Sequence, residues 1–229
     1  MRIPRSATPV LLAAALTVGL VGCSTPAAPP ATPEASEPAP TPEETTAAPS
    51  GDGDAASFAK PVTTPGELLG SASGDGFTVD VYQVGTAAAS KTGQFANPDT
   101  QQPIIAVGDD IVFVNYVVSN TGDPIDLGFS LVSISARYDD WPYIQGMDSV
   151  VDFDLFEQIG VNRDPFGPDT YRDPGVYTFG SGERYSYGEN FPYQAGSPIQ
   201  FEVSVTPVDA EGDLLHDEGL DGSGSGTIN

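Results

Sequence analysis

The chain has 229 residues, and its 32 acidic against 8 basic side chains give a formal net charge of −24 at pH 7. Proteins bind nucleic acid mainly through lysine and arginine on phosphate, so this balance argues against a nucleic-acid partner and against charge-driven adhesion to anionic lipid. The chain holds one histidine, His216, in an acidic segment, and one cysteine, Cys23, near its start. Ser-His-Asp or Cys-His catalysis and a histidine-based zinc site therefore cannot be built within a folded domain.

Residues 1–22 have the features of a secretory signal peptide, because two arginines precede the apolar run VLLAAALTVGLV. This run is shorter than the about 20 residues that a membrane-spanning helix needs. It ends in Leu-Val-Gly-Cys23, which resembles the lipobox of bacterial lipoproteins. The resemblance implies cleavage before Cys23, lipidation of its sulfur and anchoring in the bilayer at the outer face of the bacterial cytoplasmic membrane. The alternative is a plain secreted protein with an unpaired cysteine, which exported proteins normally avoid.

Residues 23–75 are predicted to be the lipidated cysteine followed by a disordered spacer. Residues 26–50 contain Pro, Ala, Thr, Ser and Glu but no aromatic and no large aliphatic side chain, so they cannot bury a core. As an extended polyproline-like chain this segment spans on the order of 80 Å, at about 3.1 Å per residue. We expect it to carry a folded domain away from the membrane and into the cell wall.

Residues 76–208 are predicted to form one all-β domain. Apolar and polar residues alternate over 77–84, and β-branched and aromatic residues fill 111–120, as is typical of strands. Further strands are expected at 129–137, 176–179, 183–187 and 199–205. No segment has helical periodicity, and short strands between Gly/Pro turns indicate an antiparallel β-sandwich.

One strand and its turn carry a resemblance to a known group of domains. The segment VGDDIVFVNYVVSNTGDPID (107–126) resembles the corresponding strand and turn of immunoglobulin-like domains in lipoproteins and secreted antigens of Gram-positive, actinobacterial-type bacteria. The turn GSGE (180–183) resembles the one before the penultimate strand of those domains. The resemblance covers about 76–206 and implies an immunoglobulin-like antiparallel β-sandwich. It implies no activity, since many of those proteins have no assigned function, and the chain departs from the group in a long insertion at 139–175.

Residues 138–193 hold 13 of the chain's 21 aromatic side chains, interleaved with acids. In one interpretation the aromatic residues pack as a satellite core and the acids face water. In another they form a recognition surface for sugar rings or a protein partner. The candidate residues of that surface are Trp141, Tyr143, Phe166 and Tyr171. In a third interpretation carboxylates bind Ca²⁺, although their spacing does not match a known calcium loop. The candidate ligands are Asp139, Asp140, Asp152 and Asp154.

Residues 209–229 are acidic and then rich in Gly and Ser, which predicts a disordered tail. Together the patterns predict a cell-surface lipoprotein whose domain is a non-catalytic binding module for an envelope protein or a wall glycan. No cofactor is expected apart from Ca²⁺ at the four aspartates. Two alternatives stay open: a calcium- or solute-binding accessory protein for transport, and a glycan-acting enzyme that uses a pair of carboxylates.

Overall fold

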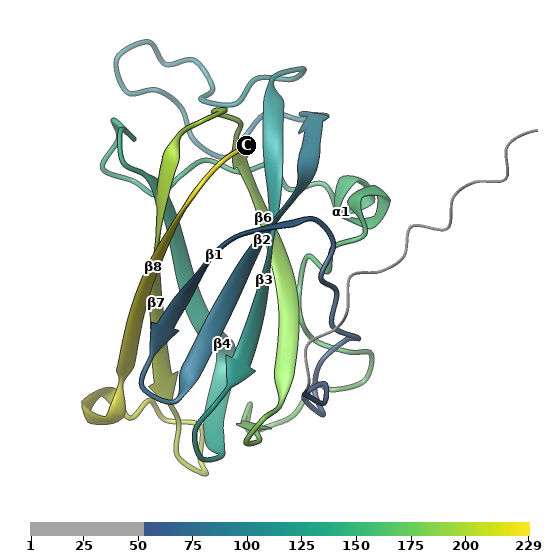
Figure 1. The fold of residues 1–229 in the computed structure, drawn as a ribbon, viewed down its shortest axis with the longest axis vertical. Coiled ribbons are helices and arrows are strands. Elements are labelled where there is room, and N and C mark those ends of the chain that lie inside the picture. Colours follow the sequence, from purple (N-terminus) through teal and green to yellow (C-terminus); the bar gives the residue numbers. More distant parts are fainter. Residues whose placement is uncertain (1–52) are drawn as a thin grey trace, which may run out of the picture. The chain divides into compact units, whose positions relative to one another are not determined.

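The computed structural model describes residues 53–229, so the predicted signal peptide, Cys23 and the Pro-rich segment 26–50 lie outside the described residues. The described part is built from eight strands and two short helices (Figure 1). In chain order these are β1 (Glu67–Gly74), β2 (Phe77–Ala88), β3 (Asp110–Asn120), β4 (Ile125–Tyr138), α1 (Phe153–Ile159), β5 (Tyr177–Phe179), β6 (Arg184–Pro192), β7 (Pro198–Pro207), the 3₁₀ helix η1 (His216–Glu218) and β8 (Leu220–Thr227).

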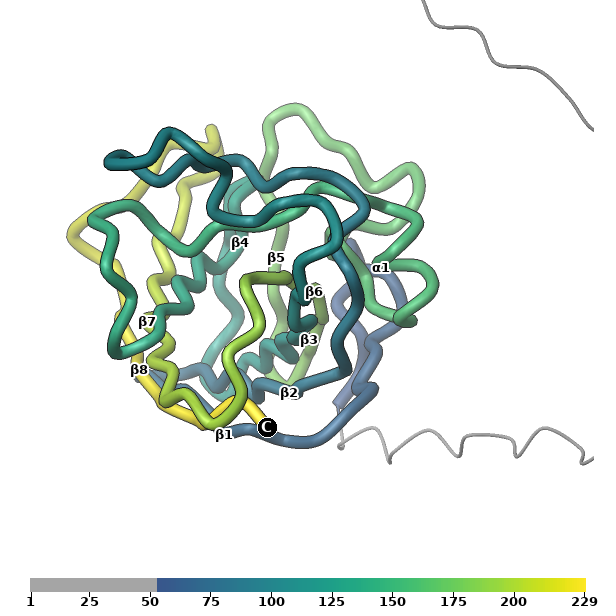
Figure 2. Tube along the Cα trace, turned by 90° about the horizontal axis from the view of Figure 1, so that it is seen from above, coloured from purple at the N-terminus to yellow at the C-terminus, as the bar shows by residue number. Residues whose placement is uncertain are grey.

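All the strands pair in antiparallel fashion, in one sheet of order β5-β4-β7-β8-β1-β2-β3-β6. The ladder is weakest between β1 and β8, where only Ser73–Ser223 and Gly74–Gly222 are paired. The sheet folds over at this junction, so that β5-β4-β7-β8 faces β1-β2-β3-β6 across the core (Figure 2). The prediction of an all-β antiparallel sandwich is confirmed.

The strand β3 lies at the centre of the packing because both of its faces are covered. Val112, Val114 and Tyr116 point into the main core between the two halves of the sheet. On the other face Ile111 and Phe113 pack against α1, where the Phe113 and Phe156 rings meet edge to face at 5.1 Å. This two-sided burial explains why β3 is the longest run of β-branched and aromatic residues in the sequence.

The predicted start of the domain at residue 76 is wrong. Strand β1 lies wholly before it, and Phe58 is fully buried in the main core, 5.5 Å from the Tyr177 ring and 5.8 Å from the Tyr185 ring. The composition of 51–75 is polar and Gly-rich, which is typical of a linker. Despite this composition, the burial of the Phe58 ring and the pairing of β1 with β2 make these residues part of the folded domain.

The prediction of a disordered tail at 209–229 is also wrong. Strand β8 pairs with β7 from Leu220–Val205 to Thr227–Pro198 and lies between β7 and β1 in the sheet. Its glycines let β1 approach closely, because a Cβ at Gly222 would lie 2.7 Å from the carbonyl oxygen of Ser73. A Gly/Ser repeat is flexible when it is free, but within a sheet the same glycines mark a close approach of two backbones.

The 139–175 insertion contains a helix that was not expected. Helix α1 has seven residues, Phe153–Ile159. Its N-cap is Asp152, whose side chain accepts a hydrogen bond from the Asp154 backbone, and its C-cap is Gly160 in the left-handed conformation. The two caps define it, since the segment is too short to show helical periodicity. Within residues 53–229, no helix is long and apolar enough to cross a membrane.

Candidate functional site

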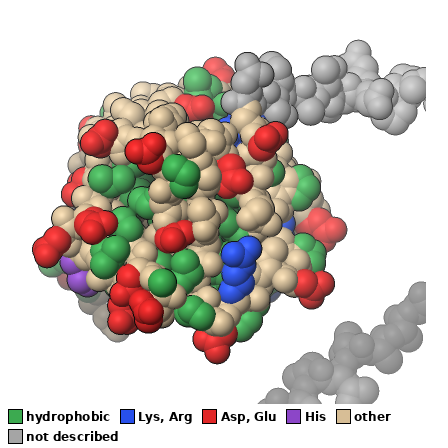
Figure 3. All heavy atoms as spheres, turned by 90° about the horizontal axis from the view of Figure 1, so that it is seen from below, with side chains coloured by type: hydrophobic (Ala, Val, Ile, Leu, Met, Phe, Trp, Pro, Cys, Tyr) green, Lys and Arg blue, Asp and Glu red, His purple; other side chains and the backbone are tan. Residues whose placement is uncertain are grey.

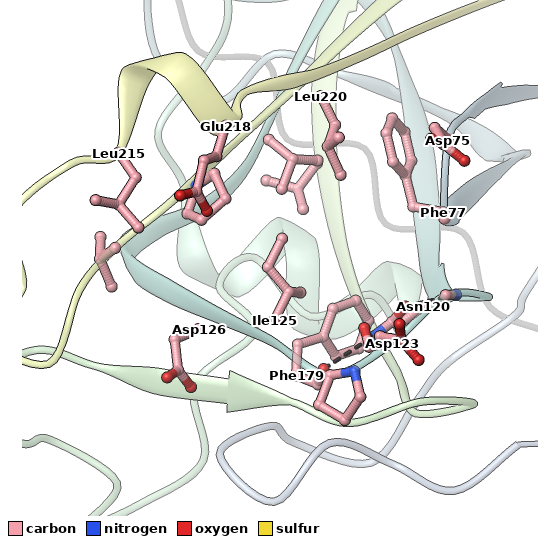
Figure 4. A pocket seen from close by; sticks show the side chains of 17 residues that line it. Asp75, Phe77, Asn120, Asp123, Ile125, Asp126, Phe179, Leu215, Glu218 and Leu220 are labelled. Carbon is pink, nitrogen blue, oxygen red and sulfur yellow. Dashed lines mark hydrogen bonds between the residues drawn. The ribbon is translucent and has the colours of Figure 1, made fainter.

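A pocket of about 520 Å³ opens between the two halves of the sandwich, at the end where β2 begins and β3 ends (Figure 4). We call it the end pocket. Its interior is apolar and includes Phe77, Ile125, Val132, Phe179, Val205 and Leu220. Its rim carries the four acids Asp75, Asp123, Asp126 and Glu218. Among the described residues that line it, none is a lysine or an arginine.

Three connecting segments that are far apart in the sequence supply three of the four rim acids. The fourth, Asp126, lies in β4 and accepts a hydrogen bond from the Thr178 hydroxyl at 2.6 Å. Asp75 lies in the tight turn between β1 and β2, Asp123 in the turn between β3 and β4, and Glu218 in η1 just before β8. The first two turns are tied together, since the backbone N–H groups of Thr121 and Gly122 donate to the Gly76 carbonyl at 2.9 and 3.0 Å. The side of the rim that carries Asp75 and Asp123 is therefore held in place before any ligand arrives, which lowers the entropic cost of binding.

Asn120 organises the turn that carries Asp123. Its side chain is buried, and its Nδ2 donates to the carbonyl oxygens of Asp123 and Phe179 at 3.0 and 2.8 Å. Its Oδ1 accepts a hydrogen bond from the Gly122 backbone at 2.9 Å. Asn120 belongs to the segment that resembles the turn of immunoglobulin-like domains. The same residue therefore predicts a turn from the sequence and fixes part of the rim of the end pocket.

Asn120→Ala is expected to destabilise the domain by roughly 3 kcal/mol, because it leaves buried backbone groups without partners. The adjacent change Thr121→Ala alters an exposed side chain and is expected to cost less than about 0.5 kcal/mol. Urea unfolding followed by circular dichroism measures both changes. Equal midpoints for the two variants would show that the Asn120 side chain does not hold the turn.

The end pocket suits a ligand that joins an apolar body to a positive charge. Viewed from this end, the surface shows acidic side chains spread around hydrophobic ones (Figure 3). Four carboxylates around an apolar interior create a negative potential at the mouth, which attracts a cation and repels an anion. A lysine or arginine side chain has this combination, with an apolar stem and a charged end.

Two of the predicted recognition residues are part of the core. Trp141 is 7% exposed, and its Nε1 donates to the Gln145 carbonyl at 3.1 Å. Tyr143 packs edge to face on Trp141 at 5.1 Å and accepts a hydrogen bond from Asn97 at 2.9 Å. The prediction that Trp141 lies on a recognition surface is wrong, because its ring stabilises the end of β4 and the loop that follows.

Phe166 and Tyr171 lie in a different aromatic group. Phe166 is partly buried, 4.8 Å from the Tyr177 ring, whereas Tyr171 is 76% exposed and stacks on Phe129 at 5.5 Å. The four predicted residues therefore do not form one surface, because Trp141 packs with Tyr143, whereas Phe166 and Tyr171 lie beside Tyr177 and Phe129.

The four aspartates that were predicted as calcium ligands are not brought together. Among residues 53–229, no group of three or more acidic, histidine or cysteine side chains could hold a metal ion. Asp152 caps α1, and the hydrogen bond from Ser90 is the main cause that lowers the pKa of its carboxyl. Asp139 accepts a hydrogen bond from Gln200 at 3.0 Å, and Asp140 and Asp154 are exposed. The predicted calcium site is therefore not formed by these residues.

Glu189 is an inward-facing carboxyl that the sequence pattern did not single out. It alternates with Tyr187 and Phe191 along β6, and its carboxylate accepts a hydrogen bond from the buried Tyr116 hydroxyl at 3.0 Å. Burial raises the pKa of Glu189, and the bond from Tyr116 offsets part of that shift. The alternation of side chains along β6 could have predicted that Glu189 faces inward, because residues 185, 187, 189 and 191 share one face of the strand.

Glu189→Gln is expected to raise stability at pH 7 and to leave it unchanged below pH 4. Because the pKa of Glu189 is raised in the folded state, the unfolded chain releases this proton first as the pH rises. The folded wild type therefore loses stability between the ordinary glutamate pKa and the raised one. Melting curves of both proteins at pH 4 and pH 7 measure this difference, and a variant that is less stable at pH 7 would contradict it.

Comparison with known proteins identifies no family for this chain. No family model matches it, and no curated protein matches it. A solved structure of a lipoprotein, ycdA, from Bacillus subtilis subsp. subtilis str. 168 is similar at 14% sequence identity with a TM-score of 0.30. The match covers 72% of this chain and 38% of that chain, so the chain spans less than half the length of the Bacillus protein. A TM-score of 0.30 is too low to carry an argument about fold or function.

Proposed function

We propose that the chain is a bacterial cell-surface lipoprotein whose immunoglobulin-like sandwich is a non-catalytic binding module. The lipobox-like segment that ends at Cys23 supports the anchor, and the Pro/Thr/Glu-rich segment 26–50 supports a spacer that presents the module to the cell envelope. The observation that carries the binding role is the end pocket, in which four acids lie around an apolar interior.

The partner that fits this pocket is an envelope protein that inserts a lysine or arginine side chain. The aliphatic stem would contact Phe77, Ile125 and Leu220, and the charged end would pair with the rim acids. A residue buried in a pocket with a charged rim is a common form of interface anchor. The end pocket offers no serine, cysteine, lysine or histidine among its described lining residues, so carboxylates are the nucleophiles that this lining could supply.

In-cell cross-linking of the anchored protein, followed by mass spectrometry, tests the binding role. Asp123→Lys/Glu218→Lys reverses two exposed rim charges, and Asp99→Lys/Glu157→Lys makes the same change of net charge at exposed positions elsewhere. We expect one reproducible partner protein with the wild type and the control variant, and at least a tenfold loss with the rim variant. Equal capture by both variants would refute the end pocket as the binding site.

The anchor is tested separately by Cys23→Ser. Without the thiol no lipid can be attached, so the protein is expected to leave the membrane fraction and enter the medium. Immunoblots of the two fractions measure this, with Ser24→Ala as the matched control. Retention of the Cys23→Ser protein in the membrane fraction would remove the lipoprotein assignment without affecting the end pocket.

A further inference from the structure

The bulge in β4 pushes an aromatic side chain out of the sandwich. Pairing with β7 jumps from Leu127–Pro207 to Val132–Val205, so residues 128–131 leave the ladder, and Leu131 adopts a φ of +50°. Phe129, within this bulge, is 52% exposed. Left-handed conformations are costly for side chains such as leucine, and such strain is found where a protein needs a particular local geometry.

The insertion is shaped to hold Phe129 in that position. Tyr171 stacks on it with ring centroids 5.5 Å apart and an interplanar angle of 25°, and Tyr177 meets it edge to face at 5.6 Å. A Cβ at Gly175 would overlap the Phe129 ring where it lies, so the glycine leaves room for the ring in this position. Two large aromatic rings are thus kept stacked and exposed, although burying them would stabilise the domain.

These rings border a cavity of about 310 Å³ that is lined by Phe129, Phe166, Gly167, Asp169, Thr170, Tyr171 and Tyr177. We call it the aromatic cleft. At Phe129 and Phe166 it adjoins a second cavity of about 260 Å³, whose lining includes Tyr187 and Glu189. None of the residues that line the aromatic cleft lines the end pocket.

The chemistry of the aromatic cleft selects among ligand classes. Among the described residues that line the two cavities, none is a lysine or arginine, so an anion would find no counter-charge there. Arg172 packs on the Tyr177 ring, 5.6 Å from its centroid, and lines neither cavity. The lining combines flat aromatic faces with hydroxyl and carboxyl groups that accept hydrogen bonds from hydroxyls.

We propose that the aromatic cleft binds a neutral saccharide, with one pyranose ring against the face of Tyr171 that is turned away from Phe129. The C–H face of a pyranose is apolar and matches an aromatic ring, while its hydroxyls donate to groups such as Asp169 and Thr170. The volume lies at the small end of the range for ligand sites, which suits a single sugar unit of a longer glycan. This second site is independent of the end pocket, so the module would meet a glycan and a protein through different faces.

A glycan array probed with the full-length protein in detergent, followed by calorimetric titration with cellotriose, maltotriose and chitotriose, tests this site. Tyr171→Ala is expected to weaken binding of a neutral oligosaccharide at least tenfold, whereas Tyr171→Phe keeps the ring and retains the affinity. Phe153→Ala removes another exposed aromatic ring, on α1, and is expected to change nothing.

The proposal is overturned if no neutral saccharide binds the wild type, or if Tyr171→Ala binds as tightly as Tyr171→Phe. Binding that is lost with Asp123→Lys/Glu218→Lys but kept with Tyr171→Ala would place the sugar in the end pocket and would also overturn it. Because Tyr171 is 76% exposed, the alanine variant is expected to fold, and an unchanged melting curve verifies this.

Discussion

Replacing Gly224 with valine is expected to unfold the domain or to destabilise it by about 3 kcal/mol. A Cβ at this position would lie 2.6 Å from the Cα of Ala72 and closer still to the Ser71 carbonyl oxygen, so β1 and β8 would have to separate. These two strands join the two halves of the sheet at its narrowest ladder. A loss of this size is a large part of the stability of an ordinary domain.

Ser225→Val is the matched control, because Ser225 is the next residue in β8 and is exposed. Valine also has a better strand propensity than serine, so this variant is expected to be as stable as the wild type. Thermal unfolding of the two variants measures the contrast. A flexible tail would tolerate both substitutions, so two unchanged melting curves would contradict the assignment of 220–227 to a central strand.

Trp141→Ala is expected to cost about 3–5 kcal/mol of stability, the usual range when a large buried aromatic side chain is removed from a core. The indole is 7% exposed, packs on Tyr143 and belongs to the main core. The variant also leaves the Gln145 carbonyl without its indole donor. Any loss of partner binding in this variant would therefore follow from unfolding.

Ile144→Ala is the control for Trp141→Ala in the same loop. Ile144 is 98% exposed, so its truncation is expected to change stability by less than about 0.5 kcal/mol. Denaturant midpoints of both variants measure the difference between a buried and an exposed apolar residue three positions apart. If Trp141→Ala kept the wild-type midpoint and lost only binding, the aromatic side chain would be part of an interface.

The strands were predictable where alternation or a β-branched run is strong, as in β2, β3 and β7. Strand β8 was not, because DGSGSG has almost no side chains to alternate and its role depends on how closely β1 approaches. Phe58 is the single aromatic residue of the polar stretch 51–75, which is too little for a pattern. The local composition indicates only what a segment can bury by itself. Strand β8 and the segment around Phe58 are stabilised by contacts with other parts of the chain, which the local composition does not show.

The binding residues were less predictable than the fold. Tyr171 and Trp141 both lie among aromatic and acidic residues in the sequence. Only the folded structure shows that Tyr171 is exposed and Trp141 is buried. In the satellite-core interpretation the acids of 138–193 face water, but Asp148, one of these acids, is fully buried and accepts hydrogen bonds from the backbones of Gln94, Phe95 and Ile105. The rim acids come from the β1–β2 turn, from the β3–β4 turn with the start of β4, and from η1, so no single spacing in the sequence relates them.

Site-specific photo-cross-linking in cells tests most directly whether the end pocket contacts a partner. A benzophenone side chain at position 123 places the probe on the rim, and one at position 107, which is 63% exposed, places it in the β2–β3 connection at the opposite end of the sandwich. The account predicts that one envelope protein is captured from position 123 and is absent from position 107. The same protein captured from both positions, or from position 107 alone, would contradict it.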